Sequence, residues 1–207
     1  MATFATIMEA LYDRLGLTAE TDLVVRLANQ AKDKFLGAAK WPYLEYTTNL
    51  VFVTSTRQYT LGTDVGHITA ILSSAGAVLE PAHRPTYEKI FRADTATAVA
   101  PTVYAIMQFS TQSAPVLHVW RTPAAIGTAT LHYVRRIPDL ANSSSAQGFE
   151  HIPSEHYFGI TEVAEAMFHE WEDSPQAPGL AQKAMQTIAM LATRVGAPLT
   201  FDATRRV

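Results

Sequence analysis

The chain of 207 residues is 48% hydrophobic and 17% charged, a composition typical of a globular protein that can bury a sizeable core. Its formal net charge of -3 argues against a protein built mainly to grip nucleic acid, because such proteins normally carry a surplus of lysine and arginine. The absence of cysteine excludes disulfides, thiolate metal sites and cysteine nucleophiles. No apolar run approaches the roughly 20 residues of a membrane span, and no signal-peptide pattern opens the sequence, so we expect a cytosolic product.

Two amphipathic helices are predicted in the first 42 residues. The first has apolar residues at three- and four-residue spacing and ends at a glycine, Gly16, which suits a C-terminal cap. Its stripe consists of Phe4, Ile7, Met8, Leu11 and Leu15, and the stripe of the second helix consists of Leu23, Val24, Leu27, Ala31 and Phe35. We expect the charged residues of the second helix, including Lys32, on the surface. Trp41, which precedes a proline and ends this helix, suits either the core or an interface.

Residues 47–138 are richer in threonine, valine and tyrosine, and they predict an antiparallel, all-β region. Its candidate strands cover residues 50–54, 58–61, 67–72, 102–109, 116–121 and 128–137. The segment 122–127 joins the last two strands and is short enough to predict a hairpin. One short helix interrupts the region, because Pro85 suits a first helical turn and the apolar residues after it share one face.

Two further helices are predicted after the β region. The first begins near Pro153, and its apolar stripe consists of Tyr157, Ile160, Ala164, Met167, Phe168 and Trp171. A segment that contains proline and glycine, 173–179, separates it from the last helix, whose stripe consists of Leu180, Ala184, Ile188, Leu191 and Val195. Four such stripes, two before and two after the β region, are what a four-helix bundle needs.

The expected fold class is therefore α+β. Residues 1–46 and 151–196 form the four-helix bundle, and residues 47–150 form an antiparallel β domain inserted into it. Residues 197–207 are expected to be an extended C-terminal tail without contacts of its own, because the segment shows no period and Pro198 prevents the last helix from continuing.

The tail carries side chains suited to docking on another protein. Leu199 and Phe201 alternate about a threonine, as a strand added to the sheet edge of a partner would. Arg205 and Arg206 can pair with carboxylates of the partner. We therefore expect these four side chains to bind a partner protein and to become ordered on binding.

Histidines and carboxylates near the third predicted helix are the only candidates for a metal site. His151, His156, Glu165 and His169 could converge if the loop folded back, but no metalloprotease spacing is present, so we expect no metal and no other cofactor. The acidic residues of this region are expected to form a solvated face, and they are Glu155, Glu162, Glu165, Glu170, Glu172 and Asp173. The sequence also lacks a serine-nucleophile turn and a glycine-rich phosphate loop, so no catalytic residue is expected.

The order of several short motifs resembles a known family. The motifs are Ala39-Lys-Trp-Pro42, Arg57-Gln-Tyr-Thr-Leu61, Ala100-Pro-Thr-Val-Tyr104, Arg121-Thr-Pro123 and the strand that ends in Tyr133-Val-Arg-Arg-Ile-Pro138, followed by Ile152-Pro153 and a helix. Together they resemble the head-tail adaptor, or connector, proteins of tailed bacteriophages. The resemblance implies a structural virion protein at the neck between head and tail, synthesised in the host cytoplasm.

The same resemblance implies partners. Copies of the chain, twelve in the family pattern, would form a ring that joins the portal protein to downstream tail or nozzle proteins. DNA would pass through the lumen without sequence-specific binding, and the C-terminal extension would dock on the portal.

Two other functions are compatible with the sequence. A carbohydrate- or peptide-binding β module of a phage tail would need an exposed aromatic cluster on the sheet, for which Tyr59, Tyr104 and Tyr133 are the candidates. A metal-dependent hydrolase would need the histidine and glutamate set around the third helix to converge.

Overall fold

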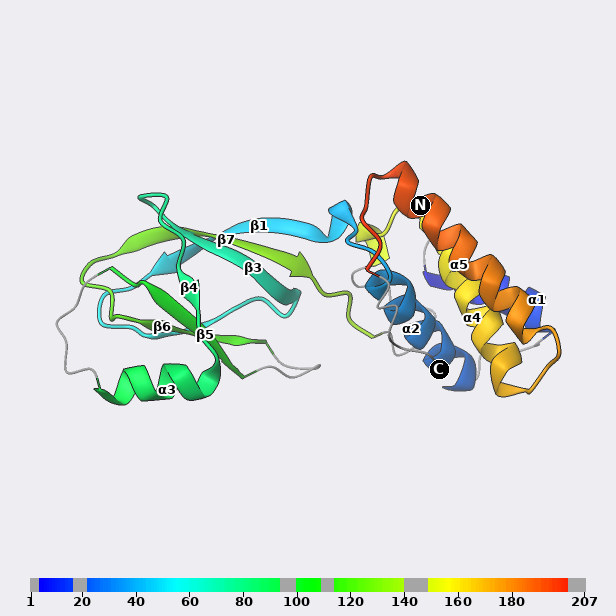
Figure 1. Cartoon of the computed structure of the whole chain (residues 1–207), viewed down its shortest axis with the longest axis horizontal. Helices are drawn as coiled ribbons and strands as arrows, with labels where there is room; N and C mark the ends of the chain where they lie inside the picture. Colours follow the sequence, from blue (N-terminus) through cyan, green and yellow to red (C-terminus); the bar gives the residue numbers. More distant parts are fainter. Residues whose placement is uncertain (1–3, 17–21, 94–99, 109–113, 140–148, 201–207) are drawn as a thin grey trace. The chain divides into compact units, whose positions relative to one another are not determined.

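The computed structural model describes residues 4–16, 22–93, 100–108, 114–139 and 149–200 (Figure 1). These residues form an α+β protein with five α-helices and two small sheets. The chain divides into two compact units. The helical unit comprises Met1–Leu44 and Asp139–Val207, and the β unit comprises Glu45–Pro138. Among the described helices, none combines the length and the apolar character that crossing a membrane would require.

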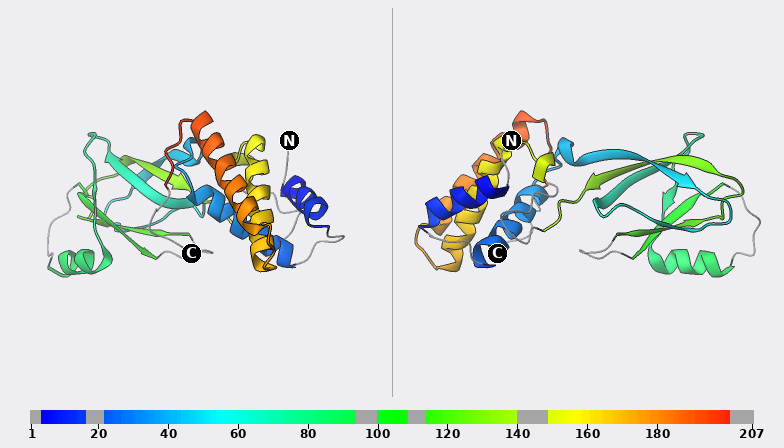
Figure 2. Two further views of the ribbon diagram at one scale, coloured as in Figure 1. Left: turned by 45° about the vertical axis from the view of Figure 1, so that its right-hand side comes forward. Right: turned by 180° about the vertical axis from the view of Figure 1, so that it is seen from behind.

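Four helices from both ends of the chain pack together in the helical unit. They are α1 (Phe4–Leu15), α2 (Asp22–Gly37), α4 (Tyr157–Trp171) and α5 (Ala177–Arg194), and short 3-10 turns cover Pro42–Leu44, Phe149–His151 and Ser154–His156. Helix α4 contacts each of the other three helices. Figures 1 and 2 show α5 and α2 beside it and α1 crossing it.

The predicted apolar stripes supply most of the interior of this unit. Ile7, Leu11, Phe35 and Ile188 are almost completely inaccessible to solvent, and Gly16 ends α1 with a φ of 64°. The prediction fails at the end of α4, where Trp171 is 67% exposed. Helical spacing indicates which face of a helix is apolar, but not where the neighbours that cover that face end.

The β unit contains two sheets. The first has the order β1-β7-β3, with β1 (Glu45–Phe52), β7 (Gly127–Arg135) and β3 (Val65–Ser73) antiparallel to their neighbours. The second has the order β2-β6-β5-β4, with β2 (Gln58–Thr60), β6 (Val116–Trp120), β5 (Val103–Gln108) and β4 (Glu80–Pro81). Strand β4 is parallel to β5, and helix α3 (Arg84–Ala93) lies on the outer face of the second sheet (Figure 1).

The core of the β unit lies between the two sheets. Leu131 and Ile71 of the first sheet and Leu117 and Val119 of the second are at most 1% exposed and belong to one apolar cluster. The predicted hairpin between the last two strands is wrong, because β6 and β7 belong to different sheets. The connecting segment 121–126 therefore crosses from one sheet to the other. A connection of this length is compatible with such a crossing as well as with a hairpin.

Candidate functional site

The predicted docking residues lie at the end of the described chain and beyond it. Leu199 is 43% exposed and forms an isolated antiparallel bridge with Ala39. Phe201, Arg205 and Arg206 lie outside the described residues. The structure thus places one of the four side chains and shows that its outer surface is accessible.

Residues 197–200, which we name the tail anchor, are bound to the helical unit. The Pro198 carbonyl accepts a hydrogen bond from the Lys40 amide at 3.0 Å, and the Thr200 amide donates to the Ala38 carbonyl at 2.9 Å. The Thr200 hydroxyl also donates to the Gly37 carbonyl at 2.6 Å. The prediction of a tail without contacts is therefore wrong for these residues.

A glycine after α5 explains how the chain reaches this position. Gly196 has a φ of 66°, a conformation that residues with a side chain rarely adopt, and it reverses the chain after α5. The following Ala197 is buried, and its amide donates to the Ala192 carbonyl at 2.8 Å. The residues after this glycine pair with Gly37, Ala38 and Lys40, which lie more than 150 residues earlier, so local sequence does not predict the pairing.

An apolar groove with a volume of about 330 Å³ begins beside the tail anchor. Its lining includes Thr200, Ala38, Met167, Met185 and Glu170. Met185 is 41% exposed, so the groove presents accessible apolar surface on the helical unit.

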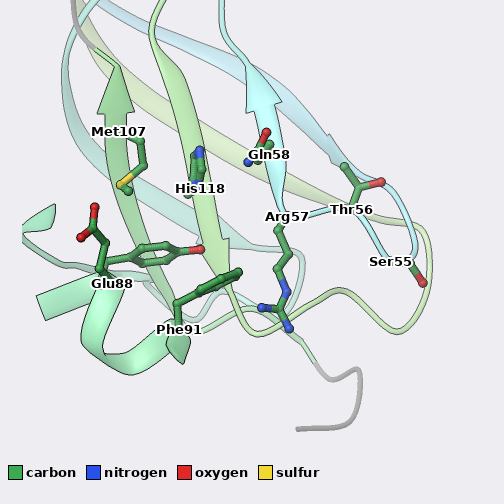
Figure 3. A pocket seen from close by; sticks show the side chains of 9 residues that line it. Ser55, Thr56, Arg57, Gln58, Glu88, Phe91, Met107 and His118 are labelled. Carbon is green, nitrogen blue, oxygen red and sulfur yellow. The ribbon is translucent and has the colours of Figure 1, made fainter. Parts of the chain in front are cut away.

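A second hollow, which we name the edge pocket, lies in the β unit and has a volume of about 650 Å³ (Figure 3). Helix α3 and strands β5 and β6 contribute Phe91, Met107 and His118 to it, and the segment 55–58 leads into β2 along its other side. The pocket exists because α3 packs on β5 and leaves the face of the sheet near β2 uncovered.

Two charged side chains, Arg57 and Glu88, line the edge pocket. The Arg57 guanidinium carbon lies 4.8 Å from the centroid of the Phe91 ring, and its Nε donates to the Thr122 hydroxyl. Glu88 is paired with Arg84, whose Nε lies 2.9 Å from Glu88 Oε1. Burial and the charge of Arg84 lower the pKa of His118, so its ring is neutral at pH 7. The pocket therefore combines one oriented cation, one carboxylate that is paired with Arg84, and aromatic and thioether surface.

The sequence matches the SU10 adaptor protein family over residues 2–206, nearly the whole chain. The chain belongs to this family. The resemblance to phage head-tail adaptors is therefore confirmed, and the protein has a structural adaptor role in a phage virion. The sequence has no significant match among curated proteins.

The three tyrosines predicted as the aromatic cluster of a sugar- or peptide-binding β module are buried in the adaptor. Tyr59, Tyr104 and Tyr133 are 9%, 6% and 4% exposed and belong to the core between the sheets. The Tyr59 hydroxyl donates to the Thr56 carbonyl at 2.8 Å, and the Tyr133 hydroxyl donates to Asp64 at 3.0 Å. These tyrosines hold the β unit together, and the alternative function loses its candidate residues.

The adaptor also does not bring its histidine and glutamate set together. His156 is 1% exposed, its Nδ1 lies 3.1 Å from the Tyr43 hydroxyl, and its ring packs 4.9 Å from that of Trp41. Burial lowers the pKa of His156, so it is a neutral core side chain at pH 7. Glu165 pairs instead with Arg14 at 2.7 Å. Within the described ranges, no three histidine or acidic side chains are grouped as a metal site requires.

Two charged residues expected on the surface are buried. Glu162 is 2% exposed, and Lys183 Nζ lies 2.9 Å from its Oε1, so the predicted solvated acidic face is wrong at this position. Lys32 is 0% exposed, and its Nζ lies 2.8 Å from Asp139 Oδ1 and 3.2 Å from Asp33 Oδ1. Both side chains lie in the interior of the helical unit, where a charge with an ion-pair partner is tolerated and an unpaired charge is strongly destabilising.

Proposed function

We propose that copies of this adaptor form a ring, twelve in the family pattern, that joins the portal to the downstream tail or nozzle proteins and continues the DNA channel at the virion neck. The match to the adaptor family over residues 2–206 carries this proposal. The net charge of -3 supports it, because a channel wall that binds DNA weakly lets DNA pass. The role is structural and assigns no catalytic residue.

The C-terminal segment docks on the portal through Leu199, Phe201, Arg205 and Arg206. The tail anchor supports this part of the proposal, because its hydrogen bonds fix the position of Thr200, the residue that precedes Phe201 in the sequence. A segment with a fixed origin loses less conformational freedom on binding than one that is free from residue 197 onward.

The mass and symmetry of the purified protein, alone and mixed with portal, test the ring. Native mass spectrometry and negative-stain electron microscopy would report a ring of copies alone or on the portal. A protein that remains monomeric and unbound at all portal concentrations would refute the proposal.

Two truncations separate docking from stability. Removing residues 201–207 should leave the melting temperature unchanged and abolish attachment to portal-containing heads. Removing 197–207 should also lower the melting temperature by several degrees, because it breaks the hydrogen bonds of the tail anchor, each with a net value of about 1 kcal/mol. If the variant that lacks only residues 201–207 attached to heads as well as the full chain does, the portal contact would have to lie elsewhere. The apolar groove beside Thr200 would then be the next surface to test.

A further inference from the structure

We propose that the edge pocket and the free edge of β2 form a binding site for an extended segment of another virion protein that carries a carboxylate side chain. The segment adds as a strand beside β2, and its carboxylate binds Arg57. This site is separate from the docking of the C-terminal segment, because all of its residues belong to the β unit.

Strand β2 has a free edge among the described residues. In the described part of the chain, β2 pairs with β6 on one side and with no strand on the other. The Val119 amide donates to the Arg57 carbonyl at 2.9 Å, and the Leu61 amide donates to the Pro115 carbonyl at 3.0 Å. Because hydrogen-bonded positions alternate along an antiparallel strand, the backbone N–H and C=O groups of Gln58 and Thr60 face away from β6. They are available to a further strand.

An oriented cation, Arg57, lies directly before this edge strand in the sequence. Contact with the Phe91 ring and the hydrogen bond from Nε to Thr122 hold the Arg57 guanidinium in place. No carboxylate of a described residue forms an ion pair with it. An arginine held in this way can bind a carboxylate through its two terminal nitrogens with little further loss of side-chain freedom.

Apolar side chains line part of the edge pocket. Phe91 is 41% exposed, and Met107 lines the same hollow (Figure 3). Side chains of an added strand point to one face at every second position, about 6.6 Å apart. The matching segment therefore carries an acidic residue at one position and an aliphatic residue two positions away.

Charge selects an acidic segment over a basic one, because Glu88 is already paired with Arg84 and His118 is neutral. A second copy of the chain matches poorly through its C-terminal segment. Phe201 and Asp202 are adjacent in sequence, so a strand would direct them to opposite faces. We therefore assign the site to a different protein.

The test uses the full chain labelled with nitrogen-15 and the capped peptide acetyl-Leu-Thr-Glu-Thr-Leu-Thr-amide. In an NMR titration, we expect saturable shifts at the amides of Gln58 and Thr60 and at the ring of His118. The matched peptide with glutamine in place of glutamate should bind about tenfold more weakly or worse, because it loses a charge-assisted hydrogen bond.

Two variants complete the test. Arg57→Gln should weaken binding of the glutamate-containing peptide until it equals binding of the glutamine-containing peptide. Thr60→Pro removes the outward N–H without touching Arg57, is tolerated on an edge strand, and should abolish both titrations. Equal binding of the two peptides, or the absence of saturable shifts at millimolar peptide, would overturn the proposal. Concentration-dependent self-association that shifts the same amides and is lost in Arg57→Gln would overturn the assignment to another protein, because it would place a second copy in the site.

Discussion

Among the described glycines of the helical unit, Gly159 in the first turn of α4 is the one at which an added Cβ would meet its neighbours most closely. A Cβ added to Gly159 would lie 2.5 Å from Phe35 Cε2 and 3.1 Å from Leu191 Cδ1. The Phe35 ring is 0% exposed and stacks on Trp41 with centroids 4.9 Å apart, so it has no free direction in which to move. We therefore expect Gly159→Ala to separate α4 from α2.

Two opposing terms set the magnitude of this effect. Alanine is favoured over glycine within a helix by up to about 1 kcal/mol, whereas overpacking a rigid core costs about 1–3 kcal/mol. A contact of 2.5 Å lies far inside the normal carbon–carbon separation, so the cost falls toward the upper end of that range and exceeds the gain. The net loss of about 1–2 kcal/mol should lower the melting temperature by about 2–8 °C if the whole chain melts as one unit, and by about 4–16 °C if the smaller helical unit melts alone.

Thermal unfolding followed by circular dichroism would measure the change. Gly179→Ala is the matched control, because Gly179 lies in the first turns of α5 and a Cβ there would meet nothing within 4 Å. The control should melt at or slightly above the temperature of the original protein. A double-mutant cycle with Phe35→Leu should show a coupling energy of about 1 kcal/mol or more, because the smaller side chain relieves the clash. If Gly159→Ala melted no lower than Gly179→Ala, the close approach of α2 and α4 would not be a constraint on the sequence.

Two further predictions concern polar groups in the same unit. The free energy of unfolding should fall as the pH drops below the ordinary histidine pKa of 6.5, because burial lowers the pKa of His156 and the unfolded chain takes up the proton more readily. His156→Gln should flatten this dependence in urea titrations at pH 5 and pH 7, and an unchanged slope would show that other groups cause it. Lys183→Met should destabilise the unit by about 1–3 kcal/mol, because it leaves Glu162 buried without its cation. The loss should be smaller than for a fully buried ion pair, because the Lys183 side chain is 56% exposed. Adding Glu162→Gln should recover most of that loss, and a double variant as unstable as Lys183→Met alone would refute the role of the pair.

The helices could be predicted from the sequence because their signal is local. Apolar residues at three- and four-residue spacing, together with a glycine such as Gly16 or a proline such as Pro42, define each helix and its end within one segment of chain. The structure places all four terminal helices where the stripes indicated them, and it packs them together. Trp171 is the exception, because exposure at a helix end depends on where the neighbouring helices stop.

The sequence predicts strands at β1–β3 and β5–β7, but it predicts neither β4 nor the pairing between strands. The short connection between β6 and β7 predicted a hairpin, whereas β7 pairs with β1 and β3, far away in sequence. Alternation identifies a strand and its buried face, and it does not specify which sheet the strand joins. The edge pocket could not be predicted for the same reason, since its lining depends on where α3 lies over the second sheet.

The burial of Lys32 is indicated by its spacing from apolar residues of the same helix. Lys32 lies four residues after Ala28 and three before Phe35, both of which are fully buried, so helical spacing already placed it on the inner face of α2. Its carboxylate partner Asp139 lies 107 residues away and could not be inferred. A lysine in line with an apolar stripe thus indicates a distant acidic partner, because an unpaired charge would be too costly to bury.

The tail anchor connects the end of the chain to the centre of the helical unit. The last carbonyl groups of α2 have no partner within the helix, and distant or neighbouring donors satisfy them. The Thr200 amide and hydroxyl bind the Ala38 and Gly37 carbonyls, and Trp41 Nε1 donates to the Phe35 carbonyl at 3.2 Å. Trp41 in turn stacks on Phe35, whose ring contacts the position of Gly159 in α4. A force that pulls on the chain beyond Thr200 would therefore be resisted by the hydrogen bonds of the tail anchor. These bonds would transmit the force to the C-terminal end of α2 and to the aromatic core beside it. A docking segment needs such an origin if it is to hold two parts of a virion together, because a contact anchored only to a frayed helix end would yield before the interface did.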